Sequence, residues 1–155
     1  MSIYVLGFLI GVVTGLRTFM GITAVSWAAR LHAIELGDTK LAFLGYAATP
    51  YILSALALGE LVTDQLPKTP SRLVPPQFGA RVVMGALAGA ALGAANHAIV
   101  AGLITGVLGA VVGTVGGAKL RGALAKAFGR DMPAALLEDL VAIGLAIFVV
   151  TRGAL

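Results

Sequence analysis

Residues 58–85 read LGELVTDQLPKTPSRLVPPQFGARVVMG and separate two strongly apolar parts of the chain. Glu60 and Asp64 lie four residues apart, on one face of the predicted helix that ends here. The four prolines that follow forbid a continuing helix, because proline lacks a backbone N–H and clashes with the preceding turn. We therefore predict an irregular loop over residues 67–77 that joins two membrane helices and gathers charged residues near their ends.

The composition of the chain is that of a membrane protein. Of its 155 residues, 59% are hydrophobic and only 12% are charged, and the mean hydropathy is +0.98. A soluble domain of this length is about half apolar and about a quarter charged. Long apolar runs predict membrane spans, each of about 20 residues. We expect one all-α domain over residues 1–155, a polytopic transmembrane helical bundle in the cell inner membrane, with the lipid bilayer around it.

Several classes of function lack the residues that they need. The chain has no cysteine, which excludes disulfides, thiolate nucleophiles and Cys-ligated metals. Its two histidines, His32 and His97, match no metal motif, and Ser71 has no histidine nearby in sequence to act as a base. The net charge of +4 comes from cations that flank apolar runs, which favours membrane topology over nucleic-acid binding. We expect no enzyme activity, no cofactor, no metal and no nucleic-acid partner.

The apolar runs predict about five spans, although four or six also fit the sequence. The first run is longer than the hydrocarbon thickness, so it either tilts or breaks near Arg17, the one cation in its middle. Asn96 and His97 mark a tight turn inside a run that is too long for one helix. Residues 119–131 either extend the fourth span or lie on the membrane surface as an amphipathic segment. The predicted spans are residues 3–29, 46–66, 81–95, 99–118 and 134–150.

Five spans would place the two chain termini on opposite sides of the membrane. They would also place the proline-rich loop and residues 119–130 together, on the side that carries most of the cations. This side holds Lys68, Arg72, Arg81, Lys119, Arg121, Lys126 and Arg130, and the other side holds Arg30, Lys40 and Arg152. Because cytoplasmic loops carry an excess of Lys and Arg, we predict a cytoplasmic N-terminus and proline-rich loop, with the C-terminus outside.

Glycines recur every four residues in three of the predicted spans, a spacing that lets another helix approach closely. These predicted packing residues are Gly7, Gly11, Gly15, Gly85, Gly89, Gly93, Gly109, Gly113 and Gly117. We expect glycine-rich packing in the bundle, and a homo-oligomer (a dimer or larger) because five short spans enclose little volume. The pattern G-x-R-x-x-M-G occurs at residues 15–21 and 79–85, which leaves two alternatives, an internal repeat or a chance similarity between glycine-rich helices.

The charged residues within or beside the apolar runs are the candidates for function. An ionised side chain at the bilayer centre costs about 2.5 kcal/mol or more, so it needs a partner. The candidate residues are Arg17, Glu60, Asp64, Ser71, Arg72, Arg81, Glu138 and Asp139. Two alternatives stay open. One is a polar vestibule in which Arg17 or Arg81 receives an anion, or Glu60 carries a proton or cation; the other is a set of ion pairs that locks the bundle.

Four segments carry a resemblance to a known family. They are GLRTFMG at residues 15–21, GELVTDQLPKTPSR at 59–72, GARVVMGALAGA at 79–90 and ALLEDLVAIGLA at 135–146. The chain resembles, over nearly its whole length, the bacterial membrane-protein family known as domain of unknown function 4126. The spacing E-x-x-x-D-x-x-P-x-x-P-S-R is the most specific part of the likeness. The resemblance implies a small integral membrane protein and supplies neither a substrate nor a catalytic residue.

Two functions follow from these patterns. The first is a transporter or channel-like protein for a small ion or solute, which uses the buried Arg and Glu side chains. The second is a structural or assembly subunit of the membrane, whose glycine-lined helix faces bind partner helices.

Overall fold

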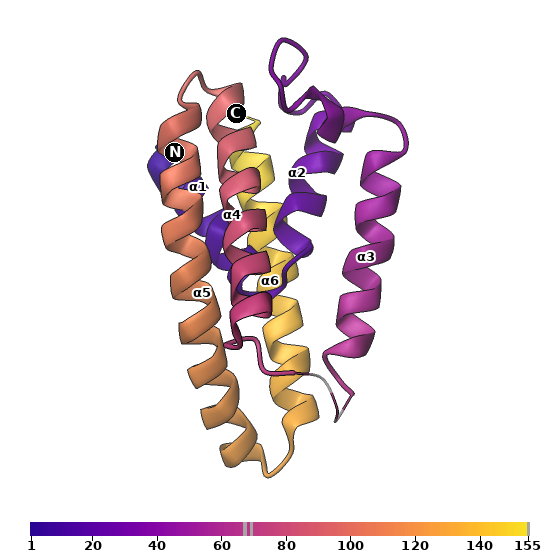
Figure 1. Cartoon of the computed structure of the whole chain (residues 1–155), viewed down its shortest axis with the longest axis vertical. Helices are drawn as coiled ribbons and strands as arrows, with labels where there is room; N and C mark the ends of the chain where they lie inside the picture. The colour runs from indigo at the N-terminus through magenta and orange to yellow at the C-terminus, as the bar shows by residue number, and fades with distance from the viewer. Residues whose placement is uncertain (67, 69, 155) are drawn as a thin grey trace.

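A computed structural model of the chain describes residues 1–66, 68 and 70–154, and its regular structure in these residues is helical throughout (Figure 1). The elements are α1 (Ile3–Leu16), α2 (Met20–Arg30), the short 3-10 helix η1 (Ala42–Gly45), α3 (Thr49–Thr63), α4 (Pro75–Ala95), α5 (Ile99–Phe128) and α6 (Asp131–Gly153). Three of them, α4, α5 and α6, are long and apolar enough to cross a membrane. The all-α class is therefore confirmed for the described residues, and the three long apolar helices are compatible with a membrane protein.

The first apolar run is broken, which was one of the two predicted alternatives. Its two halves are α1 and α2, and Arg17 between them has an extended backbone with φ −139° and ψ 115°. The chain then turns back on itself, because Gly21 at the start of α2 lies against Ile10 and Thr14 of α1. The two helices form a hairpin that enters the bundle and leaves it at the end where it began (Figure 1).

The two chain ends therefore lie at the same end of the bundle, whereas five full spans would place them at opposite ends; the side of the membrane on which each terminus lies stays a prediction. α1 runs parallel to α5, since Gly7 lies beside Gly102 and Gly11 beside Gly106. Both chain ends lie at the upper end of the bundle in Figure 1, together with residues 31–48 and the α4–α5 turn. We call this the terminal end. The α3–α4 connection and the α5–α6 turn lie at the other end, which we call the basic end.

Several helix boundaries differ from the predicted ones. α4 begins at Pro75 and not near residue 81, because Pro75 and Pro76 occupy the first helical positions, where a missing N–H is tolerated. The predicted loop is accordingly shorter, and its members Pro67 and Thr69 lie outside the described residues. α3 has only 15 residues, about 23 Å of helix.

α5 and α6 also differ from their predicted spans. α5 continues for 30 residues, about 45 Å, so residues 119–128 extend the fourth span and do not form a separate surface segment. α6 begins at Asp131 and ends at Gly153, and Pro133 lies in its first turn as expected. The predicted turn at Asn96 and His97 is confirmed, with His97 in the left-handed region at φ 55°.

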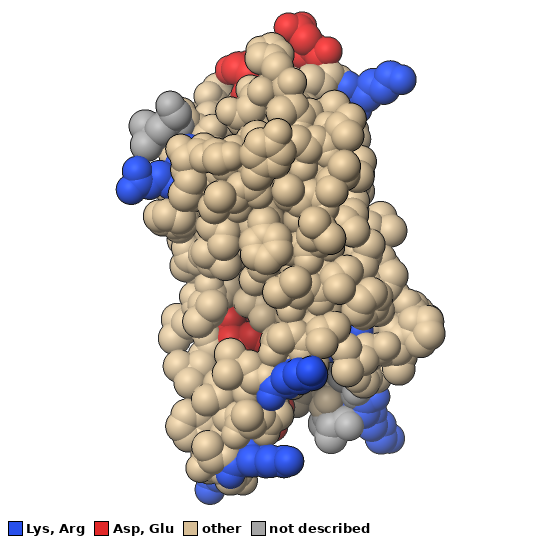
Figure 2. All heavy atoms as spheres, turned by 90° about the vertical axis from the view of Figure 1, so that its left-hand side faces the viewer, with Lys and Arg blue, Asp and Glu red and all other residues tan. Residues whose placement is uncertain are grey.

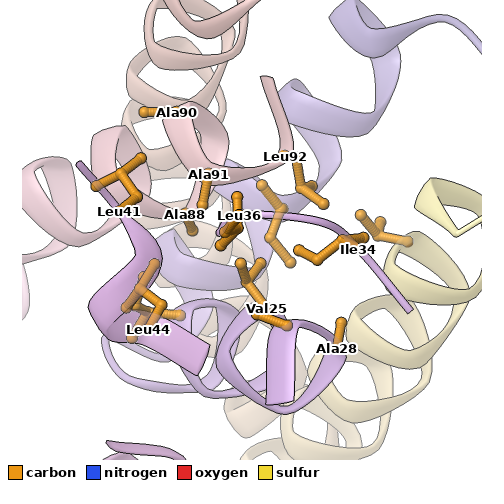
Figure 3. Packing of buried hydrophobic residues seen from close by; sticks show 14 of the residues in the cluster. Val25, Ala28, Ile34, Leu36, Leu41, Leu44, Ala88, Ala90, Ala91 and Leu92 are labelled. Atoms are coloured by element: carbon orange, nitrogen blue, oxygen red, sulfur yellow. The ribbon is translucent and has the colours of Figure 1, made fainter. Parts of the chain in front are cut away.

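An apolar core fills the terminal end. It joins Val25 and Ala28 of α2 to Ala88, Ala91 and Leu92 of α4 (Figure 3). Four further members come from the connection between α2 and α3, which folds back over these helices; they are Ile34, Leu36, Leu41 and Leu44. The hairpin is thus held in place by a buried apolar cluster on one side, whereas its turn points toward the charged residues at the other end.

The glycines at four-residue spacing lie where helix backbones come close. A Cβ atom on Gly11 would overlap the carbonyl oxygen of Gly106, and one on Gly89 would overlap that of Gly102. Gly7, Gly15 and Gly85 likewise face α5, and Gly93 lies against Ala98 and Ile99, where α5 begins. Gly109 and Gly113 of α5 face α1. Gly117 differs, because its neighbours are the side chains of Leu16, Arg72 and Glu138.

Candidate functional site

Charged side chains from four helices (α3, α4, α5 and α6), from the break in the first apolar run and from the α3–α4 connection converge toward the basic end of the bundle. Four arginines, Arg17, Arg72, Arg81 and Arg121, meet five carboxylates, Glu60, Asp64, Asp131, Glu138 and Asp139. The two sets nearly balance, so the group satisfies the requirement that embedded charges meet partners. We call these nine residues the charge network.

Arg17 is the innermost member of the charge network. Its side chain is fully buried. Its Nε donates to Asp139 Oδ1 at 2.7 Å and its Nη1 donates to Asp64. Its Nη2 also lies within ion-pair distance of Asp139, although the angle there does not make a hydrogen bond. Arg17 therefore ties the break in the first apolar run to both α6 and the end of α3.

Two other side chains hold the exposed backbone groups at the break. Glu60 accepts hydrogen bonds from the backbone N–H groups of Thr18 at 2.6 Å and Phe19 at 3.0 Å, just ahead of α2. A carboxylate is favoured there because the N-terminus of a helix carries partial positive charge. Arg81 Nη1 donates to the carbonyl oxygens of Gly15 and Leu16 at the end of α1, each at 3.0 Å. Both ends of the broken helix are thus capped by side chains from α3 and α4.

Arg72 and Arg121 form the outer layer of the charge network. Arg72 makes a two-pronged contact with Glu138, with its Nη2 3.0 Å from Oε2. Arg121 binds both oxygens of Asp131, at 3.0 Å and 2.6 Å, and reaches Glu138 at 3.4 Å. The Asp131 side chain is 58% exposed, whereas that of Glu138 is only 7% exposed. The Arg121–Asp131 pair is therefore the one that opens at least cost, since exposed ion pairs contribute little to stability.

A cavity of about 390 Å³ lies among these groups at the basic end. Arg81 reaches its inner wall, and Arg72, Arg121 and Asp131 lie around it with Ser71 and Gln77. Arg81 is 2% exposed, and its Nε has no hydrogen-bond partner among the residues that the structure describes. A buried guanidinium N–H without a partner is costly, and a negatively charged ligand in the cavity would reduce that cost.

The structure brings most of the predicted site residues together. Arg17, Glu60, Asp64, Arg72, Arg81, Glu138 and Asp139 all belong to the charge network, and Ser71 lines its cavity. The sequence reading grouped Arg121 only with the cations of the basic end, and it did not select Asp131. The sequence feature that could have indicated the Arg121–Asp131 pair is Gly129, which lies between the two residues. Its φ of 69° ends α5 and lets α6 turn back beside it.

The described part of the chain, residues 1–66, 68 and 70–154, contains no group of three or more His, Asp or Glu side chains arranged to hold a metal ion. No protein-family model, curated protein or solved structure matches the chain. The resemblance to domain of unknown function 4126 therefore stays a prediction, and the function has to be argued from the geometry of the charge network.

Proposed function

We propose that the protein is a transporter or channel-like protein for a small ion or solute, and that the cavity at the basic end is its entrance. The observation that carries this proposal is the position of Arg81. Its side chain lies on the wall of a cavity, and it also holds the end of α1 and contacts Glu60 at 3.4 Å. A ligand that binds Arg81 would therefore act directly on the break in the first apolar run.

The break gives the hairpin a means to move. Broken helices occur at the substrate sites of many transporters, where their ends meet substrate and ions near the middle of the membrane. Here Glu60 and Arg81 hold those end groups, and each is within reach of other charged partners, such as Asp64 at 3.9 Å from Arg81. Exchange of partners within the charge network would release the hairpin without leaving an isolated charge.

The net positive charge of the residues that line the cavity favours an anion as the ligand. Three arginines line it against two aspartates, and one of these, Asp131, is mostly exposed. An anion that displaced Asp131 would find Arg121, with Arg72 and Arg81 nearby. The alternative reading, in which Glu60 carries a proton or cation, is less well supported because Glu60 already accepts two backbone hydrogen bonds.

We further propose that the basic end lies in the cytoplasm of a cell with this protein in its inner membrane. Lys68, Lys119, Lys126 and Arg130 are exposed there, and Figure 2 shows cations gathered at the lower end of the viewed face, below a largely uncharged band. The positive-inside bias then places both chain termini on the opposite side.

The second function, a structural or assembly subunit, has less support. It relied on glycine faces that bind partner helices, yet the predicted packing glycines lie against helices of the same chain. A homo-oligomer stays a prediction, and it would have to use other surfaces.

Anion flux into proteoliposomes tests the proposed function. The assay follows radiolabelled chloride, sulfate and phosphate in vesicles with wild-type protein, with Arg121→Gln and with Lys126→Gln. Arg121→Gln is expected to fold, since it leaves Asp131 at the surface and Glu138 bound to Arg72, and to lower flux about tenfold or more, because it removes charge-assisted hydrogen bonds to the ligand. Lys126 is exposed on the same helix and is absent from the cavity lining, so its change should leave flux within about twofold. Flux equal to that of empty vesicles for all three anions, or unchanged in Arg121→Gln, would contradict the proposal.

A further inference from the structure

The cavity at the basic end has an apolar neighbour. A groove of about 80 Å³ lies between α5 and α6. Arg121 lines both spaces, so the groove and the cavity meet at its side chain. The apolar residues of the groove are Leu16, Leu120, Leu124, Ala134, Leu137 and Val141.

The groove opens on the surface that faces lipid. Leu120, Leu137 and Val141 are 61%, 42% and 57% exposed, on helices that are long and apolar enough to span the membrane. Within a bilayer these side chains lie among acyl chains, so a lipid chain can enter the groove sideways without passing through water. The polar cavity beside it cannot hold such a chain, because its walls are charged.

Exposed lysines beside the cavity indicate the level at which lipid headgroups would lie. Lys119 and Lys126 flank Arg121 on α5 and are exposed. Long cationic side chains near helix ends extend toward the headgroups and mark the interface. On this reasoning the cavity would meet the bilayer near the depth of the phosphate groups, and the groove beside it would reach from Leu124 to Val141, toward the acyl chains.

We propose that the cavity and groove together bind an anionic phospholipid, with its phosphate in the cavity and one acyl chain in the groove. Guanidinium groups match phosphate with two parallel hydrogen bonds. Arg121 becomes available when the exposed Asp131 side chain swings away, and Arg72 and Arg81 line the same cavity. The proposal rests on the proposed function for the location of the anion site, and it adds a lipid ligand whose binding does not require transport.

Lipid binding by the purified protein tests this inference. Native mass spectrometry of the whole chain in detergent would compare dioleoyl phosphatidic acid, which has a phosphate headgroup, with dioleoyl phosphatidylcholine, which has the same chains and a zwitterionic headgroup. Inorganic phosphate forms a third arm. We expect phosphatidic acid to bind about tenfold or more tightly than either of the others, and Arg121→Gln to remove most of that preference.

Two tryptophan variants separate the acyl groove from the headgroup cavity. Leu137→Trp fills the groove at an exposed position and should weaken phosphatidic acid binding about tenfold, while Val112→Trp, on a lipid-facing part of α5 outside the groove, should not change it. Equal binding of the two phospholipids would overturn the proposal. It would also be overturned if inorganic phosphate bound as tightly as phosphatidic acid, or if Leu137→Trp had no effect. Lipid binding without anion flux would contradict the proposed function and leave the lipid site in place. Anion flux without a preference for phosphatidic acid would contradict the lipid site and leave the proposed function in place.

Discussion

Replacing Arg17 with glutamine is expected to lower the free energy of unfolding by about 3–5 kcal/mol, a large part of the stability of a small domain. The reason is that Arg17 is fully buried and binds Asp64 and Asp139, two carboxylates of which only 15% and 11% of the side chain is exposed. Glutamine leaves Asp139 without its cation and leaves Asp64 with only the more distant Arg81, at 3.9 Å. Thermal unfolding of purified protein in detergent, followed by circular dichroism, would measure the loss.

Two controls show whether this loss comes from the buried charge. Arg17→Lys keeps the positive charge but lacks the planar guanidinium group that binds both carboxylates. Its melting temperature should therefore lie between those of the wild type and Arg17→Gln. Lys126→Gln also removes a cation, at an exposed position, and should change stability by less than about 0.5 kcal/mol. If Arg17→Gln and Lys126→Gln had the same melting temperature, the charge network would not be what holds the hairpin.

Replacing Gly106 with valine is expected to have an effect of similar size on the packing of α5. Its Cβ would overlap the carbonyl oxygen of Gly85, and Gly106 is also the residue against which Gly11 packs. A side chain there has to separate α5 from α4 at a point where the neighbour is backbone and cannot turn aside. We expect a loss of about 3 kcal/mol or more, at the upper end of the range for overpacked sites.

Gly116→Val on the same helix is the matched control, because a Cβ at Gly116 meets open space. Both changes lower helix-backbone freedom and add the same side chain, so any difference between them reports the contact. Melting temperatures and the yield of monodisperse protein after gel filtration in detergent would record it. Equal stability of the two variants would show that close glycine contacts between α4, α5 and α1 do not hold the bundle.

The sequence predicted the helical class, the turn at Asn96 and His97, and most members of the charge network, because these follow from local composition and from the cost of a charge in lipid. It also offered a break near Arg17 as one of two alternatives. It did not predict the hairpin, since the direction in which the chain leaves Arg17 depends on Glu60 and Arg81, which lie 43 and 64 residues further along.

Other differences have the same long-range origin. The connection between α2 and α3 contains charged residues, yet Ile34, Leu36, Leu41 and Leu44 within it are buried in the apolar core. Proline pairs do not reveal from sequence alone whether they break a helix or begin one, and Pro75 and Pro76 begin α4. The hairpin is the largest departure from the predicted arrangement, because it brings the two chain ends to the same end of the bundle.

The central claim of this account is that α1 and α2 form a hairpin around the charged break and together do not cross the membrane. The chain has no cysteine, so single cysteines at Ser2, Asp38 and Arg130 can be labelled from either side with a membrane-impermeant maleimide. In intact cells we predict labelling of Ser2→Cys and Asp38→Cys, with Arg130→Cys labelled only after the membrane is opened. Five full spans would instead place Ser2 with Arg130 and opposite Asp38, and labelling in that pattern would contradict the account.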